Sequence, residues 1–273
     1  MRTGLIICTL VLTQISATKA ADLRTPAPPL PVVSLRSSDP VPLWSGFYVG
    51  VSGAYSFGKS DLVLSPSPDF LTVNPSPQMF DFIADRGTST IRPTGFGGGF
   101  QAGYKTQAGG VVVGVEADWS HLGSRQSTST GILLMPDGTT TVSFSQSASI
   151  SQLATLRGII GVPVGNFLPY LTGGVGVGWE SVSQSILAHP IRLPVPCVCW
   201  SGQTSRTQAG WVVGAGIEYM ISTRVSAKTE YLYSDLGSLQ FTTLGPIGLE
   251  GLDLAHSARF TNQIARVGLN FRL

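Results

Sequence analysis

The chain has 273 residues, of which 12% are charged, and its formal net charge is +2. The charged share is about half that of an ordinary soluble protein, and so small a net charge, without a basic stripe, argues against nucleic-acid binding. Beyond the N-terminus, no apolar run reaches the roughly 18–20 residues of a membrane-spanning helix. Such a chain fits either a soluble β protein or a transmembrane β-barrel.

The N-terminal region predicts an exported protein. Residues 1–20 resemble a Sec-type signal peptide, with Arg2 at the start, a short apolar stretch over residues 5–12, and Ala20 before the cleavage point. A buried N-terminal helix is the alternative. Residues 21–43 predict an extended periplasmic linker, because prolines exclude a helix or a central strand. These prolines are Pro26, Pro28, Pro29, Pro31, Pro40 and Pro42.

From Trp44 onward the hydrophobic pattern has a period of two, which predicts β-strands. In residues 47–57 the odd positions include Phe47, Val49 and Tyr55, whereas the even positions are mostly small or polar. The same alternation recurs in residues 96–106, 111–119, 150–162, 169–181, 209–221, 225–233 and 262–273. These eight segments have about the length of transmembrane β-strands.

The connections between these segments alternate in length. Short turns are predicted at 105–110, 163–167 and 222–223, and long Gly-, Pro-, Ser- and Thr-rich loops at 58–95, 121–148, 183–208 and 234–258. Short periplasmic turns and long outer loops are typical of outer-membrane barrels. We therefore predict an all-β fold, an eight-stranded antiparallel transmembrane β-barrel over residues 44–273 with long extracellular loops and both ends in the periplasm. A secreted β-sandwich is the rival, but its edge strands would place charges on the apolar face.

The polar faces of the strands carry charges of both signs. An eight-stranded barrel is just wide enough inside to be filled by side chains, and an unpaired charge there is costly. We expect a salt-bridged network that plugs the lumen, with an ion pathway as the alternative, and lumen glycines such as Gly216 that make room for bulky neighbours. The predicted network is Lys105, Glu116, Asp118, Arg157, Glu180, Glu218, Lys228, Glu230, Arg266 and Arg272.

Aromatic residues on the apolar faces lie near strand ends, which is typical of the girdles that barrels place at the two membrane interfaces. Core packing in a soluble protein is the alternative. The predicted girdle comprises Phe47, Tyr55, Trp119, Trp179, Trp211, Tyr219, Tyr231 and Phe271.

Candidates for other chemistry are few. Cys197 and Cys199 are one residue apart, and we expect a strained loop disulfide or inert thiols. No second Cys or His pair in the sequence completes a metal site with them. His121, His189 and His256 all fall in predicted loops, and no nucleophile–base constellation is evident. The sequence therefore predicts neither an enzyme nor a bound cofactor or metal.

Both ends of the expected mature chain carry a family resemblance. The sequence Ala-Ala-Asp-Leu at 20–23, the proline-rich linker, Trp-Ser-Gly-Phe-Tyr-Val-Gly at 44–50 and Arg-Val-Gly-Leu-Asn-Phe-Arg-Leu at 266–273 resemble the opacity-like small outer-membrane β-barrel proteins of alphaproteobacteria. The resemblance implies a porin-like surface antigen, and some relatives bind hemin. The family usually ends in an aromatic residue that the barrel-assembly machinery recognises. Here Leu273 holds that place, and Phe271 lies two residues earlier.

We therefore expect a structural barrel of the Gram-negative outer membrane that presents surface loops around a mostly plugged lumen. The alternatives are a small porin or weak channel, and a loop-mediated ligand or adhesion module, including hemin binding through His121 or His189. The expected partners are outer-membrane lipid, the assembly machinery acting on the last strand, and a host or environmental ligand at the loops, with no nucleic acid.

Overall fold

The computed structural model describes residues 43–66, 77–190, 198–243 and 253–273. The predicted signal peptide and nearly all of the linker lie outside these residues, as do Cys197 and the side chain of Cys199. The strands are β1 (Gly46–Pro66), β2 (Ser89–Ile91), β3 (Thr94–Ala108), β4 (Val111–Ser129), β5 (Leu133–Leu134), β6 (Thr140–Gly161), β7 (Phe167–Pro190), β8 (Val198–Met220), β9 (Val225–Thr243) and β10 (Leu254–Arg272), and the helix is α2 (Pro77–Gly87).

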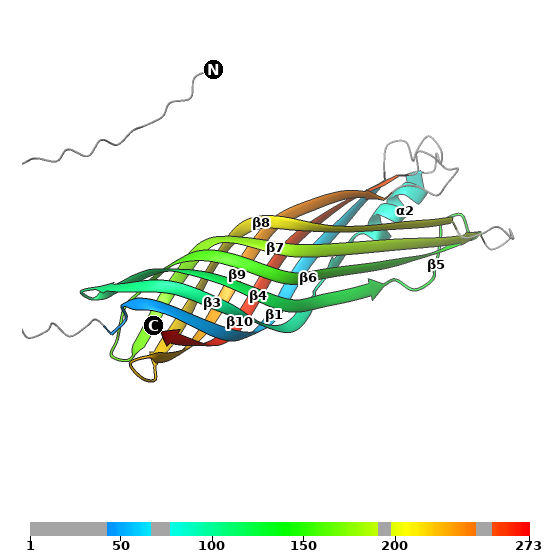
Figure 1. The fold of residues 1–273 in the computed structure, drawn as a ribbon. Helices are drawn as coiled ribbons and strands as arrows, with labels where there is room; N and C mark the ends of the chain where they lie inside the picture. Colours follow the sequence, from blue (N-terminus) through cyan, green and yellow to red (C-terminus); the bar gives the residue numbers. More distant parts are fainter. Residues whose placement is uncertain (1–42, 67–76, 191–197, 244–252) are drawn as a thin grey trace, which may run out of the picture. The chain divides into compact units, whose positions relative to one another are not determined.

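Eight of these strands form a closed antiparallel ring (Figure 1). The order β1-β3-β4-β6-β7-β8-β9-β10 follows the chain, and β10 pairs with β1 from Tyr48↔Arg272 to Pro66↔Leu254. The short strands β2 and β5 pair with β1 and β6. The predicted eight-stranded antiparallel β-barrel is confirmed, and three short turns join β3 to β4, β6 to β7 and β8 to β9 where the sequence predicts them.

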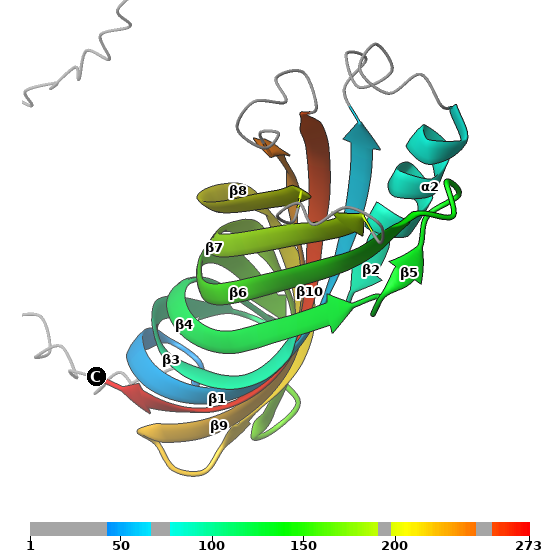
Figure 2. The same cartoon turned by 90° about the vertical axis from the view of Figure 1, so that its right-hand side faces the viewer.

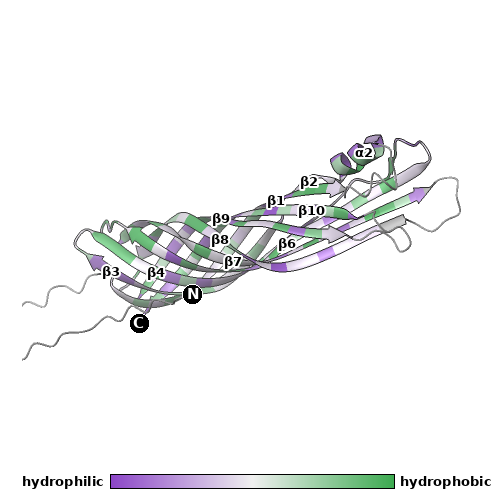
Figure 3. Ribbon diagram, turned by 90° about the horizontal axis from the view of Figure 1, so that it is seen from above, coloured by the Kyte–Doolittle hydropathy of each residue, from purple (hydrophilic) through white to green (hydrophobic). Residues whose placement is uncertain are grey.

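The outer wall of the barrel near the short turns is apolar. Val113, Val213 and Val267 are 43%, 46% and 67% exposed, although each is a large hydrophobic residue. Their neighbours along the strands point inward, and they include the apolar Val112 and Val212 as well as glycines and Arg266. Figure 3 shows this as hydrophobic and hydrophilic residues alternating along the strands. A wall that exposes apolar side chains all around the ring is suited to lipid.

The strands are longer than the sequence pattern predicts, and this corrects the loop boundaries. β1, β4, β6, β7, β8, β9 and β10 all continue into the segments expected to be loops. In these continuations the faces exchange character, so that the outer face becomes polar and the inner face apolar. On β7, Trp179 points outward and is followed on the same face by Ser181 and Ser183, while the inward face changes from glycine to Val182 and Ile186. Beyond the lipid the outer face meets water, so polar residues move outward and apolar residues pack inside.

The extended strands form two facing sheets rather than a continuous ring (Figure 2). Pairing of β3 with β4 ends at Thr94↔Arg125, and pairing of β8 with β9 ends at Trp211↔Asp235. One sheet therefore consists of β4, β6, β7 and β8, and the other of β9, β10, β1 and β2.

The interior of this extension holds its own hydrophobic cluster, which buries one face of α2. The cluster contains Leu64, Met79, Ile83, Met135, Val142, Phe144, Ile186, Ala188, Trp200 and Leu254. The helix starts at Pro77, a residue suited to the first helical turn. In the described ranges, no helix is long and apolar enough to cross a membrane.

Candidate functional site

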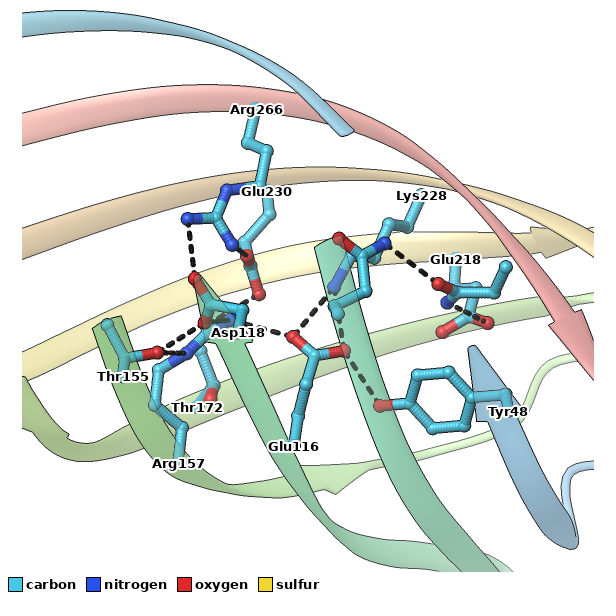
Figure 4. Close-up of polar contacts among 12 residues, drawn as sticks. Tyr48, Glu116, Asp118, Thr155, Arg157, Thr172, Glu218, Lys228, Glu230 and Arg266 are labelled. Carbon is cyan, nitrogen blue, oxygen red and sulfur yellow. Dashed lines mark hydrogen bonds and ion pairs between the residues drawn. The ribbon is translucent and has the colours of Figure 1, made fainter. Parts of the chain in front are cut away.

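The centre of the barrel interior is built around Arg157 on β6. Strand register places Glu116 of β4 directly opposite it, and the guanidinium Nη2 lies 2.7 Å from Glu116 Oε1 and 3.0 Å from Asp118 Oδ2. Nη1 reaches Glu230 Oε1 on β9 at 2.8 Å. All four side chains are fully buried. Figure 4 shows Arg157 reaching carboxylates on two different walls of the barrel.

Two further cations complete this central network. Lys228 Nζ lies 2.7 Å from Glu116 Oε1. Arg266 Nη2 lies 3.0 Å from Asp118 Oδ1, and its Nη1 lies 3.7 Å from Glu230 Oε2. Each carboxylate therefore faces two cations, and three positive charges balance three negative ones. Because every charge is paired and the group has no net charge, the cost of removing these charges from water is offset.

Uncharged donors add hydrogen bonds to the same three carboxylates. The Tyr48 hydroxyl donates to Glu116 Oε2 at 2.7 Å, and the Tyr170 hydroxyl donates to Glu230 Oε1 at 3.1 Å. Thr155 donates to Asp118. Glycine provides the space for these rings, since a Cβ at Gly216 would lie 2.5 Å from the Tyr170 hydroxyl oxygen.

A second ion pair lies toward the short-turn end of the barrel. Lys105 contacts Glu218, whose other oxygen accepts hydrogen bonds from Ser226 at 2.6 Å and Asn270 at 3.1 Å. The Lys105 ammonium also sits 4.4 Å from the centroid of the Tyr48 ring. A cavity of about 20 Å³ next to this pair has room for roughly one water molecule.

Two residues of the predicted charge network, Glu180 and Arg272, belong neither to the central network nor to the Lys105–Glu218 pair. Glu180 is 2% exposed, but neither of its carboxylate oxygens accepts a hydrogen bond from a protein group. Arg272 is at the short-turn rim, where its guanidinium donates to the carbonyl oxygens of Leu43 and Thr223. Arg272 is too close to the chain end to reach the central network, and Glu180 lies beyond the girdle residue Trp179, where the interior is already apolar.

Apolar layers cover the charged network on both sides, and the sequence interpretation missed them. On β6 the inward residues run Ile159, Arg157, Thr155, Leu153, so a hydrophobic residue precedes and follows the charge. The layer toward the short turns contains Trp44, Val112, Ile159, Leu168, Tyr170 and Met220. The larger layer on the other side includes Leu122, Ile150, Leu153, Val182, Val212, Leu232, Leu236, Phe260 and Ile264. The sequence does contain evidence for these layers, because their residues occupy the same inward-facing alternate positions along the strands as the charged residues.

The eight predicted girdle residues all lie on the outer wall and are 37–63% exposed. They gather at two levels. Near the short turns, the rings of Phe47 and Tyr104 and of Phe167 and Tyr219 have centroids 4.7 and 4.8 Å apart. At the other level, Trp211 contacts Tyr233 at 5.3 Å between centroids. Two aromatic bands around an apolar wall define the two membrane interfaces.

The histidines do not form a common site. His121 and His189 are exposed, whereas His256 is buried, stacks on the Phe241 ring at 4.6 Å and contacts the Thr243 hydroxyl at 2.8 Å. Burial lowers the pKa of His256 to about 4. Within the described ranges, no three His, Cys, Asp or Glu side chains gather as metal ligands would.

Comparison with known proteins agrees with this architecture. The outer membrane protein beta-barrel domain matches residues 30–272. The 31 kDa outer-membrane immunogenic protein of Brucella melitensis biotype 1 is 29% identical over 231 residues, which cover 84% of this chain and 83% of that protein. The 22 kDa outer membrane protein of Rhizobium leguminosarum bv. viciae is 27% identical, over 74% of this chain and 69% of that protein.

Among solved structures, the outer membrane protein OprG from Pseudomonas aeruginosa aligns with a TM-score of 0.47 and 15% identity, over 84% of this chain and 96% of that one. The resemblance to alphaproteobacterial outer-membrane antigens that the chain ends predict is confirmed by the Brucella and Rhizobium relatives. The chain is an outer-membrane protein and belongs to the family of outer membrane protein β-barrel domains.

Proposed function

We propose that this protein is a closed structural barrel that anchors a surface-exposed β extension in the outer membrane and does not conduct ions. The observation that carries the proposal is the central network, in which Arg157 and Arg266 bridge opposite walls of the lumen. Arg157 occupies the space between β4 and β9, where a pore would have to run.

The layered interior adds a second obstacle to conduction. An ion entering from the surface side meets a hydrophobic layer before it reaches the central network. From the short-turn side it meets the Lys105–Glu218 pair beside a second group of apolar residues. It would then have to replace ion pairs between fully buried groups, which are strong in a medium of low dielectric constant. The porin alternative has no comparable support, since the cavity beside Lys105 holds only about 20 Å³.

The same features support a role without catalysis. The charges of the central network are paired with one another, and their side chains are fully buried, so a substrate has no access to them. The surface extension, with α2 and its hydrophobic cluster, is the part that meets other molecules, as suits a relative of immunogenic outer-membrane proteins. We also propose that the assembly machinery engages β10, where Phe271 is 48% exposed beside the closing seam with β1.

Single-channel recording in planar bilayers tests the closed lumen. The wild-type chain, with its insertion verified by protease protection, should give no steady conductance. The variant Arg157→Ala/Glu230→Gln should give none either, because the apolar layers remain. A steady ohmic current in the wild type that changes in size or ion preference with Arg157→Ala would establish the porin function instead.

A further inference from the structure

The outer face of the sheet β4-β6-β7-β8 carries a regular array of hydroxyl groups just beyond the girdle. Cross-strand register aligns its positions in three rows of four. The rows are Arg125–Ser149–Ser181–Ser205, Ser127–Ser147–Ser183–Gln203 and Ser129–Ser145–Ser185–Ser201. Ten of the twelve residues are serine, and we call this surface the serine lattice.

The lattice is accessible and concave. All twelve residues are exposed or half-buried. Eight of them, the members of the second and third rows, border a groove of about 560 Å³ that crosses all four strands, and the first row lies beside it. Some hydroxyls already pair across strands, as Ser147 does with Ser183 at 2.8 Å and Ser205 with Ser181 at 2.9 Å. With strands about 4.8 Å apart, a molecule lying across the groove meets a hydroxyl on each strand, except where Gln203 takes the place of serine on β8.

Solvent exposure alone does not account for this composition, because the facing sheet has the same exposure and a different surface. Outward positions there mix serines with charged and apolar side chains such as Asp61, Arg259 and Val63. Residues that favour strands are mainly β-branched or aromatic. Serine therefore predominates at the outward positions of one sheet only. The serine lattice contains no carboxylate.

Serine hydroxyls donate and accept hydrogen bonds, as sugar hydroxyls do. The row nearest the lipid also holds Arg125, and a guanidinium pairs well with phosphate. This row lies directly beyond Trp179 on β7, at the height where the outer leaflet of a Gram-negative membrane exposes the phosphorylated saccharide of its glycolipid. We infer that the serine lattice binds the saccharide part of outer-leaflet lipopolysaccharide.

The inference is tested on the full chain in phosphatidylcholine nanodiscs. The probe is the lipid-free phosphorylated core oligosaccharide released from lipopolysaccharide by mild acid, and binding is measured by calorimetry. The main variant is Ser145→Ala/Ser147→Ala/Ser183→Ala/Ser185→Ala. Two matched controls are Ser65→Ala/Ser238→Ala/Ser257→Ala on the facing sheet and the same four lattice residues changed to threonine. The heat-dependent gel shift of folded barrels verifies folding.

Wild type should bind saturably, and the alanine variant should raise the Kd at least about tenfold, since several hydrogen bonds are lost. Both controls should stay within about twofold of wild type. If the alanine variant does not fold, Ser183→Ala alone should still weaken binding about threefold. Arg125→Gln should weaken binding of the phosphorylated saccharide but not of its dephosphorylated form. Absence of saturable binding by wild type, or equal binding by the alanine variants, would overturn the inference.

Discussion

Arg157 and Glu230 meet at 2.8 Å although their strands, β6 and β9, are separated in the ring by β7 and β8. Arg266 and Asp118 likewise meet at 3.0 Å across the interior from β10 and β4. Backbone hydrogen bonds connect each strand only with its two neighbours in the ring. These side-chain contacts connect opposite walls, so the charged network ties the barrel together through its centre and makes its stability depend on a few residues.

Removal of Arg157 should therefore be expensive. Arg157→Ala leaves Glu116, Asp118 and Glu230 with only two cations, and breaking a buried ion pair in this way costs about 3–5 kcal/mol. Urea unfolding in phospholipid vesicles, followed by tryptophan fluorescence, measures the loss. Arg125→Ala is the matched control, because Arg125 is exposed on the outer face and its loss should change the free energy of unfolding by less than about 0.5 kcal/mol.

Rebalancing the charges should recover part of this stability. Arg157→Ala/Glu230→Gln leaves two matched pairs, Lys228 with Glu116 and Arg266 with Asp118. The double variant should be more stable than Arg157→Ala alone, because no carboxylate is left in excess. If the two substitutions instead destabilise additively, Arg157 acts by filling space and not by neutralising charge.

The sequence predicts the ring itself well, because strand alternation and the spacing of turns are local properties. It predicts that Arg157 faces inward with Glu116 and Asp118 for the same reason. The contact between Arg157 and Glu230 depends on how the whole ring curves, so local pattern does not reveal it. A lipid-facing alternation of apolar residues does not predict the strand extensions, because beyond Trp179 the apolar residues change to the inner face.

The outward orientation of the apolar side chains predicts which positions of the barrel face lipid. Val213 on β8 is 46% exposed between the two aromatic levels. Val213→Arg should lower the free energy of unfolding in vesicles by roughly 2–4 kcal/mol, because a charge would be placed in the hydrocarbon. Gln203→Arg, on the outer face of the same strand beyond the girdle, should have little effect. Equal losses in the two variants would mean that the lipid boundary is drawn in the wrong place.

Glycine packing in the lumen gives a further prediction. A Cβ at Gly216 would meet the Tyr170 hydroxyl at 2.5 Å and displace a ring that donates to Glu230. Gly216→Ala should therefore destabilise the barrel by about 1–3 kcal/mol through overpacking. Gly53→Ala is the control, since no atom lies within 4 Å of that Cβ on the outer wall. A neutral Gly216→Ala would show that Tyr170 does not need its present position.

Membrane topology can be examined by labelling. Asp137 lies in the turn before β6 on the surface extension, and Gly110 lies in the short turn between β3 and β4. In a background with Cys197 and Cys199 replaced by serine, a membrane-impermeant maleimide should label Asp137→Cys on intact cells. Gly110→Cys should react only after the outer membrane is permeabilised. Labelling of Gly110→Cys on intact cells would reverse the assigned orientation.

His256 should make the surface extension sensitive to acid. It is 4% exposed, and its ring contacts are the uncharged Phe241 and Thr243, with Leu64 of β1 at the paired backbone position. Burial lowers its pKa to about 4, against about 6.5 in an unfolded chain. Between these two values the unfolded chain binds a proton that the folded chain does not, so the free energy of unfolding falls as the pH falls.

The expected loss is up to about 1.4 kcal/mol for each pH unit between pH 6.5 and 4. Urea unfolding at pH 7.5 and pH 5.0 measures it. His256→Gln should have a smaller difference between the two pH values, because glutamine keeps hydrogen-bonding capacity toward Thr243 but does not titrate. His189→Gln, at an exposed position on β7, should keep the wild-type difference. If His256→Gln loses as much stability on acidification as wild type, then groups other than His256 set the acid sensitivity.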